Sequence, residues 1–460
     1  MQRLLVLLVL LIFSGSLPAA DYYVSSTAQA GGDGSLARPF RSLSQVAFIA
    51  AEGDTIYLMS GGPGTFHDGA IRLKSGQKLL GAGQSGRPVE SASATVQVTN
   101  SSGALNGSVV VLSSDNEIAG LHFVDLKGHG IIAGDENISG AYIHHNIFTN
   151  SAESEQIIWP ISLVSESGVI GSVEISDSIF RDGRDMGGIQ IVHQGSSFGS
   201  YFFRGNEFRN LGGRAYHLQT MHDSRINSII LNSSVDNIGR GNRNSDSILP
   251  MLQGSSSQTM LVKGFYYNNS QQVGNQSNTG MEVFLMGNPF VGEENWCDGC
   301  KLELFIEDSI FENTVTDGIQ LTNFGSNSEI DIEIRHVQVI NANPQQAGGA
   351  ISLIAENAQN SGSRSTLLIE NSDMVDSSGY GFVVLDQNKG YTSKVDLGGG
   401  QLGSKGNNRI LNNDDGAVSA IQANPVARHN WWGPAGKPEA QLEGGRSSFV
   451  WQPALEKDPR

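Results

Sequence analysis

Short runs of alternating apolar and polar residues recur along the chain, and they belong to one repeating unit. The clearest copies are "YIHHNIFTN", "VEISDSIFRD", "YFFRGNEFRN", "LELFIEDSIFEN" and "LLIENSDMVD". Each copy joins an alternating segment to a small polar residue, a bulky apolar residue and an Asn or Asp two places later. Period-two alternation predicts short β-strands, and no helical periodicity separates the copies.

The unit occurs ten times at spacings of 25 to 44 residues. The bulky positions are Phe123, Phe148, Phe180, Phe208, Val235, Tyr267, Phe311, Val339, Met374 and Ile410. The Asn or Asp positions are Asp125, Asn150, Asp182, Asn210, Asn237, Asn269, Asn313, Asn341, Asp376 and Asn412. Repeats of this kind predict an all-β fold, a single-stranded right-handed parallel β-helix whose coils stack about 4.8 Å apart. The bulky residues should form an internal ladder, and the Asn and Asp should occupy one repeated turn.

Both ends of such a solenoid need covering, because exposed strand edges aggregate. In "RSLSQVAFIAAEGDTIYLM", Leu43, Val46, Ala47 and Ala50 fall on one helical face. The stretch predicts an N-terminal capping helix over Ser42–Glu52, with "TIYLM" beginning the first coil. Near the other end, Trp431 and Trp432 in "HNWWG" are suited to plugging the core or to stacking on a sugar ring; we favour the plug because they follow the last Asn copy.

The predicted organisation has four parts. Residues 1–20 combine a basic start, the apolar run Leu4–Phe13 and small residues, which is typical of a secretory signal peptide. Residues 21–60 form the N-terminal cap and first coil, 61–435 the parallel β-helix and 436–460 a C-terminal tail. We therefore expect an exported protein (extracellular, periplasmic or at the cell surface) with no transmembrane segment in the mature chain.

Charge and cysteine content narrow the function classes. The formal net charge is −17, which argues against nucleic acid or anionic membranes as main partners. The two cysteines, Cys297 and Cys300, lie in "ENWCDGCKLEL". A redox site would need a βαβ context, whereas an alternating strand follows here, so we interpret the pair as a disulfide that closes a loop.

The segment "GDTIYL" preceded by "PFRSLSQVA", the "NIF" and "SIF" coils and the terminal "HNWWG" resemble secreted bacterial right-handed parallel β-helix repeat proteins of the pectate-lyase-like superfamily. The resemblance covers nearly all of residues 21–435. It implies an extracellular polysaccharide or cell-surface glycan as partner, handled by a lyase, hydrolase, epimerase, binder or adhesin. A fold with so many activities does not choose among them.

Catalytic patterns of these families are incomplete in this chain. The "KGHGI" at His129 lacks the other motifs of pectin hydrolases and is interpreted as a turn, and the Asp-Pro-His of alginate epimerases is absent. Resemblance to pectate lyases makes calcium the one cofactor to consider, with "FRDGRDMGG" as the nearest acidic cluster. Its Asp182 already belongs to the turn ladder, which puts that cluster in doubt.

A polar line is expected along one sheet. In "GGIQIVH", "GRAYHLQ", "GMEVFLM", "DGIQLTN" and "GGAISLI", alternation points one set of residues outward: Gln190, His217, Glu282, Gln320 and Ser352. The coil between His217 and Glu282 should add Asp246 or Ser247. Insertions at "NIGRGNRNSDS", "NSQQVGNQSNTG" and "GNPFVGEENWCDGC" are expected to wall a groove beside this line.

The segment "GRAYHLQTMHDSR" concentrates candidate chemistry. β-Elimination on a uronic acid needs a cation at the carboxylate and a base, which an Arg with a His or Tyr can supply. Glycoside hydrolysis needs two carboxylates, for which Glu282 with Asp246 or Asp223 is a candidate pair. The predicted catalytic residues are Arg214, Tyr216, His217 and Glu282, and the predicted substrate-binding residues are Gln190, His193, His222, Arg225 and Gln320. We prefer a lyase to a hydrolase, and the alternative is a non-catalytic adhesin, matrix or glycan-binding protein in which these are ordinary coil residues.

Overall fold

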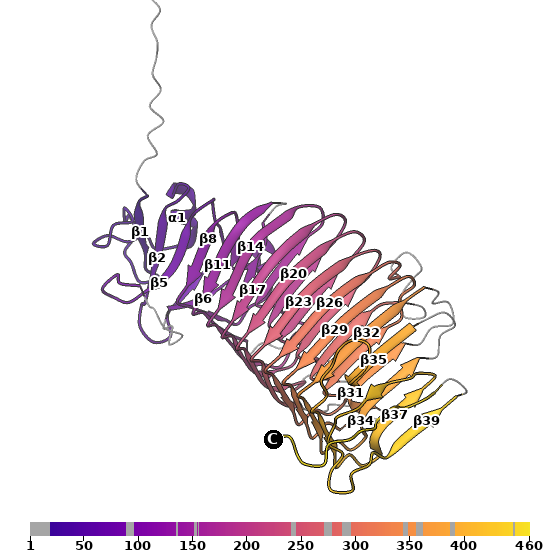
Figure 1. Ribbon diagram of the computed structural model, residues 1–460. Coiled ribbons are helices and arrows are strands. Elements are labelled where there is room, and N and C mark those ends of the chain that lie inside the picture. Colours follow the sequence, from indigo (N-terminus) through magenta and orange to yellow (C-terminus); the bar gives the residue numbers. More distant parts are fainter. Residues whose placement is uncertain are drawn as a thin grey trace, which may run out of the picture.

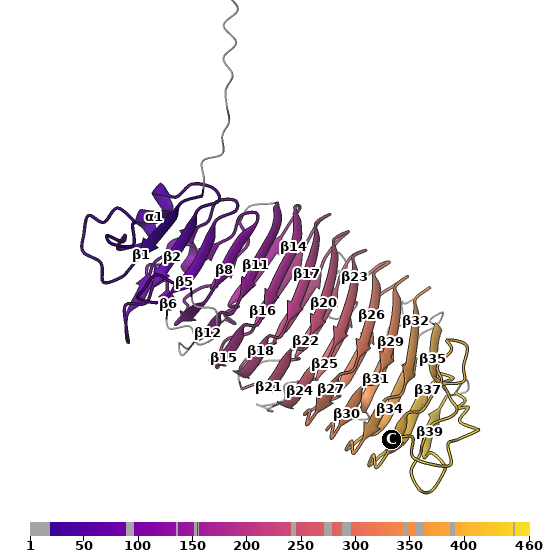
Figure 2. The same ribbon diagram turned by 60° about the vertical axis from the view of Figure 1, so that its left-hand side comes forward.

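The computed structural model describes residues 19–88, 96–134, 137–150, 154, 156–240, 245–270, 278–287, 296–343, 348–355, 362–386, 392–444 and 447–460. The chain winds into an elongated solenoid, with α1 (Leu43–Ile49) near one end and β39 (Ala440–Glu443) at the other (Figures 1 and 2). A short 3₁₀-helix spans Ala104–Gly107. No helix of the described part is long and apolar enough to cross a membrane.

Three long sheets form the walls of the solenoid, and every strand pairs in parallel with the equivalent strand of the next coil. The predicted parallel β-helix is therefore confirmed. Sheet 1 contains β1 (Asp21–Val24), β2 (Thr55–Met59), β5 (Lys78–Ala82), β8 (Asn116–Ala119), β11 (Ile138–His144), β14 (Val169–Ser176), β17 (Phe198–Arg204), β20 (Arg225–Leu231), β23 (Ser257–Lys263), β26 (Lys301–Glu307), β29 (Glu329–Arg335), β32 (Arg364–Glu370), β35 (Thr392–Gly398) and β38 (Val426–Ala427).

The other two walls follow sheet 1 in each coil. Sheet 2 contains β3 (Phe66–Asp68), β6 (Val96–Thr99), β9 (Leu121–Val124), β12 (Ile147–Thr149), β15 (Ile179–Gly183), β18 (Glu207–Leu211), β21 (Ser234–Ile238), β24 (Tyr266–Ser270), β27 (Ile310–Glu312), β30 (Gln338–Ile340), β33 (Asp373–Val375) and β36 (Arg409–Leu411). Sheet 3 contains β4 (Ile71–Arg72), β7 (Val110–Val111), β10 (Ile131–Ile132), β13 (Ile161–Ser165), β16 (Ile189–His193), β19 (Tyr216–Thr220), β22 (Ile248–Leu252), β25 (Met281–Leu285), β28 (Ile319–Asn323), β31 (Gly349–Ala355), β34 (Tyr380–Asp386), β37 (Gly416–Ile421) and β39.

The predicted internal ladder lies in sheet 2. Its aromatic part is a stack of Phe123, Phe148, Phe180 and Phe208, whose ring centroids are 4.7 Å apart at each step. The ladder continues in register through Val235 to Ile410, and all ten side chains are buried. One coil therefore adds one bulky side chain to a continuous core.

The repeated Asn and Asp adopt the left-handed backbone at nine of the ten predicted positions, Asn150 being the exception. Their side chains also bond from coil to coil: Asn210 Nδ2 donates to Asp182 Oδ1 over 2.9 Å, and Asn341 Nδ2 donates to Asn313 Oδ1 over 2.7 Å. Short polar side chains tolerate this conformation, which explains why Asn and Asp recur here.

A second left-handed turn joins sheet 1 to sheet 2, and it was not foreseen. Its positions are His145, Asp177, Gly205, Asn232, Gly264, Asp308, His336, Asn371, Asn407 and His429. The next residue is often a buried Asn or Ser; Asn146, for example, accepts from the Leu121 N–H over 3.1 Å and donates to the Ile118 carbonyl over 2.9 Å. The small polar residue of the repeat unit therefore satisfies buried backbone groups inside the turn.

The ends of the solenoid match the predicted caps, with two differences. Leu43 and Val46 of α1 are buried, but α1 ends at Ile49, and β1 precedes the "TIYLM" strand as the first strand of sheet 1. At the other end Trp432 is buried and its ring meets Phe449 edge-on at 5.9 Å, as expected of a plug. The segment predicted as a tail adds β39 to sheet 3.

Candidate functional site

The predicted polar line exists on the outer face of sheet 3. Gln190 and His217 are register partners, and so are Glu282, Gln320 and Ser352 further along. Leu249, and not Asp246 or Ser247, occupies the line between His217 and Glu282, because His217 pairs with Leu249 and Ile248 pairs with Met281. His217 and Glu282 are therefore two coils apart, about 10 Å between strands.

Asp246 lies instead at the corner where the chain enters sheet 3, and there it joins Arg214. Arg214 Nε donates to Asp246 Oδ2 over 3.1 Å, and the Thr279 N–H donates to Asp246 Oδ1 over 3.2 Å. Asp246 is completely buried, whereas 19% of the Arg214 side chain is exposed. A buried carboxylate needs such partners, since losing them would leave an uncompensated charge.

Glu282 extends this corner toward solvent. Its side chain is half-buried and shares a hydrogen bond with Asp246. Burial, together with the charge of Asp246, raises the pKa of the Glu282 carboxyl well above its usual range, and Arg214 opposes this only in part. Two carboxyl groups in contact cannot both ionise easily, so this contact favours the protonated form of Glu282.

His217 presents the complementary group. Its ring is 7% exposed and lies beside the Trp159 ring, with centroids 5.6 Å apart. Nε2 contacts Gln219 Oε1 at 3.3 Å, while Nδ1 is buried without a partner among the described residues. Burial, with the nearby Arg214, lowers the pKa of His217 to about 4. His217 is therefore a neutral imidazole with one unused nitrogen.

Two predicted site residues lie inside the solenoid. Tyr216 is fully buried in the core, where its hydroxyl donates to Ser233 Oγ over 3.0 Å. His193 is also fully buried, and its ring bonds Ser197 Oγ at 2.9 Å and the Tyr201 hydroxyl at 2.7 Å. Because both side chains point inward on their strands, neither can reach a substrate outside, and we remove both from the site.

His222 and Arg225 also lie away from His217. His222 is an exposed residue with φ of 60° in the turn that leaves sheet 3, and Arg225 is exposed on the outer face of sheet 1. Asp223 lies in the same turn as His222 and accepts from Ser255 Oγ. The dense "GRAYHLQTMHDSR" cluster is thus spread over a corner, a strand, a turn and another sheet, and only Arg214 and His217 join the site.

Sequence reasoning missed two contributors. Trp159 precedes β13, and its ring packs so closely on Gly187 that a Cβ there would lie 2.5 Å from it. Asp317 is held by Ser352 Oγ at 2.5 Å and the Gly349 N–H at 2.8 Å, and its charge also raises the pKa of Glu282. The "WP" before an alternating segment of the polar face was the available signal for Trp159.

The insertions predicted to wall the groove lie only partly within the described residues. Cys297 and Cys300 form the expected disulfide, with Cα atoms 5.5 Å apart, between β25 and β26. Residues 241–244, 271–277 and 288–295 of the three insertions lie outside the described residues. Within the described ranges, no group of three or more His, Cys, Asp or Glu is arranged to hold a metal ion. His129 lies in a turn, as predicted, and its Nδ1 is 3.0 Å from the Trp159 carbonyl.

Comparisons with known proteins give similarity in structure only. No family model matches the chain, and no curated protein matches its sequence. Among solved structures, the A-module of a mannuronan C-5 epimerase from Azotobacter vinelandii is 12% identical, with a TM-score of 0.46 over 90% of this chain and 94% of that one. A GH136 lacto-N-biosidase from Eubacterium ramulus is 11% identical, with a TM-score of 0.39 over 81% of this chain and 66% of that one. The catalytic domain of a GH87 α-1,3-glucanase is 12% identical, with a TM-score of 0.39 over 93% of this chain and 69% of that one.

Proposed function

We propose that the outer face of sheet 3 binds an extracellular polysaccharide containing uronic acid and cleaves it by β-elimination. The observation that carries the proposal is the contact between Glu282 and the buried Asp246, which raises the pKa of Glu282, on the same face as the buried ring of His217. Pairs of titratable groups whose environments push their pKa values apart are suited to acid–base work.

The reaction assigns one proton to each group. The neutral imidazole of His217 takes the proton from the carbon beside the uronate carboxylate, and the released electron pair forms the carbon–carbon double bond. The glycosidic carbon–oxygen bond then breaks, and Glu282 gives its proton to the leaving oxygen. Water returns the proton from His217 to Glu282 afterwards, so that the cycle balances.

Neighbouring residues supply binding. Arg214 uses Nε for Asp246, which leaves its terminal nitrogens for the substrate carboxylate. Gln190 and Gln320 lie on the same outward line, and the buried Trp159 ring packs beside His217. Trp159 would hold the His217 ring in place, and the two amides would bond hydroxyl groups of the sugar.

Elimination is favoured over hydrolysis because the other carboxylates near Glu282 are buried and already hydrogen-bonded. Hydrolysis needs a second carboxylate that reaches the sugar or a water about 5–10 Å from the acid. Asp246 is completely buried and used by Arg214 and Thr279, and Asp317 is held by Ser352 and Gly349. The neutral His217 is then the available base.

Replacing the proposed acid tests the reaction. We expect Glu282→Gln to lower turnover of polygalacturonate or alginate by about 100- to 10,000-fold, because general acid catalysis contributes that much. The measurement follows the ultraviolet absorbance of the unsaturated uronate together with reducing ends, with and without calcium. Glu207→Gln, on sheet 2, is the matched control and should keep full activity.

Unchanged turnover in Glu282→Gln would remove the site assignment. Reducing ends without ultraviolet absorbance would mean hydrolysis. Retained binding with no turnover on either substrate would favour the non-catalytic glycan binder.

A further inference from the structure

A groove runs along the outer face of sheet 1, on a different wall from the candidate site. It consists of three successive hollows of about 580, 330 and 460 Å³. Phe305 lines the first and second hollows, and Leu402 lines the second and third, so each hollow adjoins the next. The groove crosses the strands from β14 to β38, which is about 38 Å at the spacing of parallel strands.

The floor of the first hollow is an apolar stripe. Phe202, Ile229, Leu261 and Phe305 are register partners on four consecutive coils. Ile229 is 38% and Phe305 36% exposed, although the outward face of such a strand is usually polar. The step between coils is about 4.8 Å, which is close to the length of one pyranose residue in an extended glycan. Successive sugar rings can therefore place their C–H faces on successive side chains of the stripe.

The second hollow is acidic. It is lined by Glu303, Asp331 and Glu333, and no Lys or Arg lines it. Asp331 and Glu333 are paired with Arg364 and Arg335, whereas Glu303 is exposed and has no ion pair among the described residues. On the strands below the hollow, carboxylates outnumber cations: Glu303, Glu307, Glu329, Asp331, Glu333 and Glu370 stand against Lys301, Arg335 and Arg364. This surface repels a polyuronate and favours a glycan that carries amino groups.

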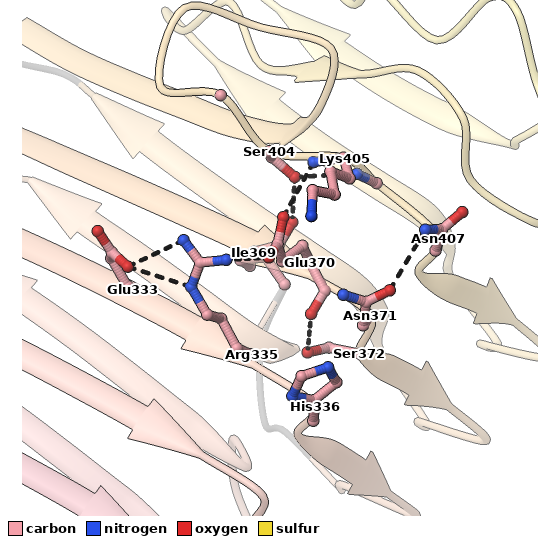
Figure 3. Close-up of polar contacts among 12 residues, drawn as sticks. Glu333, Arg335, His336, Ile369, Glu370, Asn371, Ser372, Ser404, Lys405 and Asn407 are labelled. Atoms are coloured by element: carbon pink, nitrogen blue, oxygen red, sulfur yellow. Dashed lines mark hydrogen bonds and ion pairs between the residues drawn. The ribbon is translucent and has the colours of Figure 1, made fainter.

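A fixed loop forms the wall where the second and third hollows meet. Both carboxylate oxygens of Asp396 accept backbone N–H groups of the loop, including those of Gly400 at 2.9 Å and Leu402 at 3.0 Å. Figure 3 shows how the base of this loop is attached: Glu370 accepts from the Lys405 N–H over 3.0 Å and also binds Arg335. Arg335 in turn binds Glu333 over 3.0 Å. Because this loop is already fixed before a ligand binds, binding loses less conformational entropy.

We propose that the first and second hollows of the groove on sheet 1 form a second, non-catalytic glycan site for an extended chain with free amino groups, such as an oligomer of β-1,4-linked glucosamine. The stripe contacts the ring faces, and Glu303 with its acidic neighbours contacts the ammonium groups. The site is independent of Glu282, so its failure would leave the proposed function untouched.

Two substitutions separate the contribution of the apolar stripe to binding from the contribution of the acidic side chains. Calorimetry with a glucosamine hexamer and with its fully N-acetylated form provides the measurement. Phe305→Ala should weaken binding of the glucosamine hexamer by about 3- to 10-fold, as expected for a lost ring contact. Glu303→Gln should weaken it by about 2- to 5-fold at low salt, as expected for an exposed ion pair, and should leave the acetylated hexamer unaffected. Phe66→Ala and Glu207→Gln, both on sheet 2, are the matched controls.

Three results would overturn the proposal. These are no binding of the glucosamine hexamer, binding that neither substitution changes, and tighter binding of polygalacturonate than of the glucosamine hexamer. Polylysine is a further probe. If it binds more tightly than the hexamer, and if Phe305→Ala and Glu303→Gln weaken its binding in the same way, the ligand of the groove is a basic peptide and not a glycan. Binding that Glu282→Gln weakens would instead place the hexamer on sheet 3.

Discussion

At the scale of single residues, protonation decides what the outer face of sheet 3 can do. The pKa of Glu282 is raised because its carboxyl is partly buried against Asp246, and the pKa of His217 is lowered because its ring is buried near Trp159 and Arg214. On an open coil Glu282 would be ionised near neutral pH, whereas His217 would titrate close to neutral pH. Burial therefore shifts the two pKa values in opposite directions, which is the basis of the roles proposed for Glu282 and His217.

The proposed roles predict a bell-shaped pH profile. His217 must be unprotonated to act as a base, so kcat/KM should rise as the pH rises through about 4. Glu282 must be protonated to act as an acid, so kcat/KM should fall as the pH rises through its elevated pKa. Initial rates on polygalacturonate or alginate across the acid and neutral range measure both limbs. An acid limb unchanged in His217→Gln would contradict the role of His217.

The interior His193 predicts acid sensitivity of the fold. Burial lowers the pKa of His193 to about 4, so the unfolded chain binds its proton first as the pH falls below about 6.5. Its stabilising contribution is complete above that pH and is lost toward pH 4. At pH 5 the loss should be about 2 kcal/mol. The guanidinium concentration at the midpoint of unfolding should therefore fall less between pH 7 and pH 5 for His193→Gln than for the wild type. Equal decreases in the two proteins would contradict the interpretation.

At the scale of elements, each corner of the coil imposes its own backbone requirement. The turn after sheet 2 uses left-handed Asn and Asp that bond along the stack, and the turn after sheet 1 uses a left-handed residue followed by a buried polar side chain. The strands between these corners need only alternation. Because the turns and the strands each repeat their own requirement, the repeat unit can be recognised in the sequence although the loops after sheets 2 and 3 vary in length.

Asn341 tests the conformational requirement. Its φ is 56°, and its amide donates to Asn313. Asn341→Ala and Asn341→Gly both lose this hydrogen bond, but only alanine also strains the left-handed backbone. We expect Asn341→Ala to be less stable than Asn341→Gly by about 1 kcal/mol in denaturant titrations. A glycine variant as unstable as the alanine variant would assign the whole effect to the lost side chain.

At the scale of the whole molecule, the solenoid depends on its ends. Each coil buries its apolar face against the next, so the first and last coils need other partners. Helix α1 covers one end with Leu43 and Val46, and Trp432 with Phe449 covers the other. The long exposed walls between the caps are then available for binding on more than one sheet.

Two variants of helix α1 test whether it caps the end of the solenoid. Val46 is fully buried, whereas Phe48 is 89% exposed. Val46→Asp should release α1 and expose the end of the stack, which should produce higher oligomers in size-exclusion chromatography with light scattering. Phe48→Asp should leave the elution unchanged. Equal behaviour of the two variants would show that α1 does not protect the end.

The sequence by itself determined the fold, because period-two alternation, the bulky ladder and the left-handed Asn and Asp are local requirements that every coil repeats. It also determined that Gln190, His217, Glu282 and Gln320 face outward, since alternation assigns every second residue to one side. The same alternation places Tyr216 and His193 inward, so the catalytic role predicted for Tyr216 and the substrate-binding role predicted for His193 are wrong.

Only the tertiary structure decided which of these residues form a site. Asp246 and Glu282 meet because insertions of unequal length separate coils that nevertheless stack in register, and no spacing in the sequence gives that register. Trp159 reaches His217 across an intervening coil because Gly187 leaves room for its ring. The shifted pKa values follow from burial, which is a property of the packed solenoid and not of any segment of the chain.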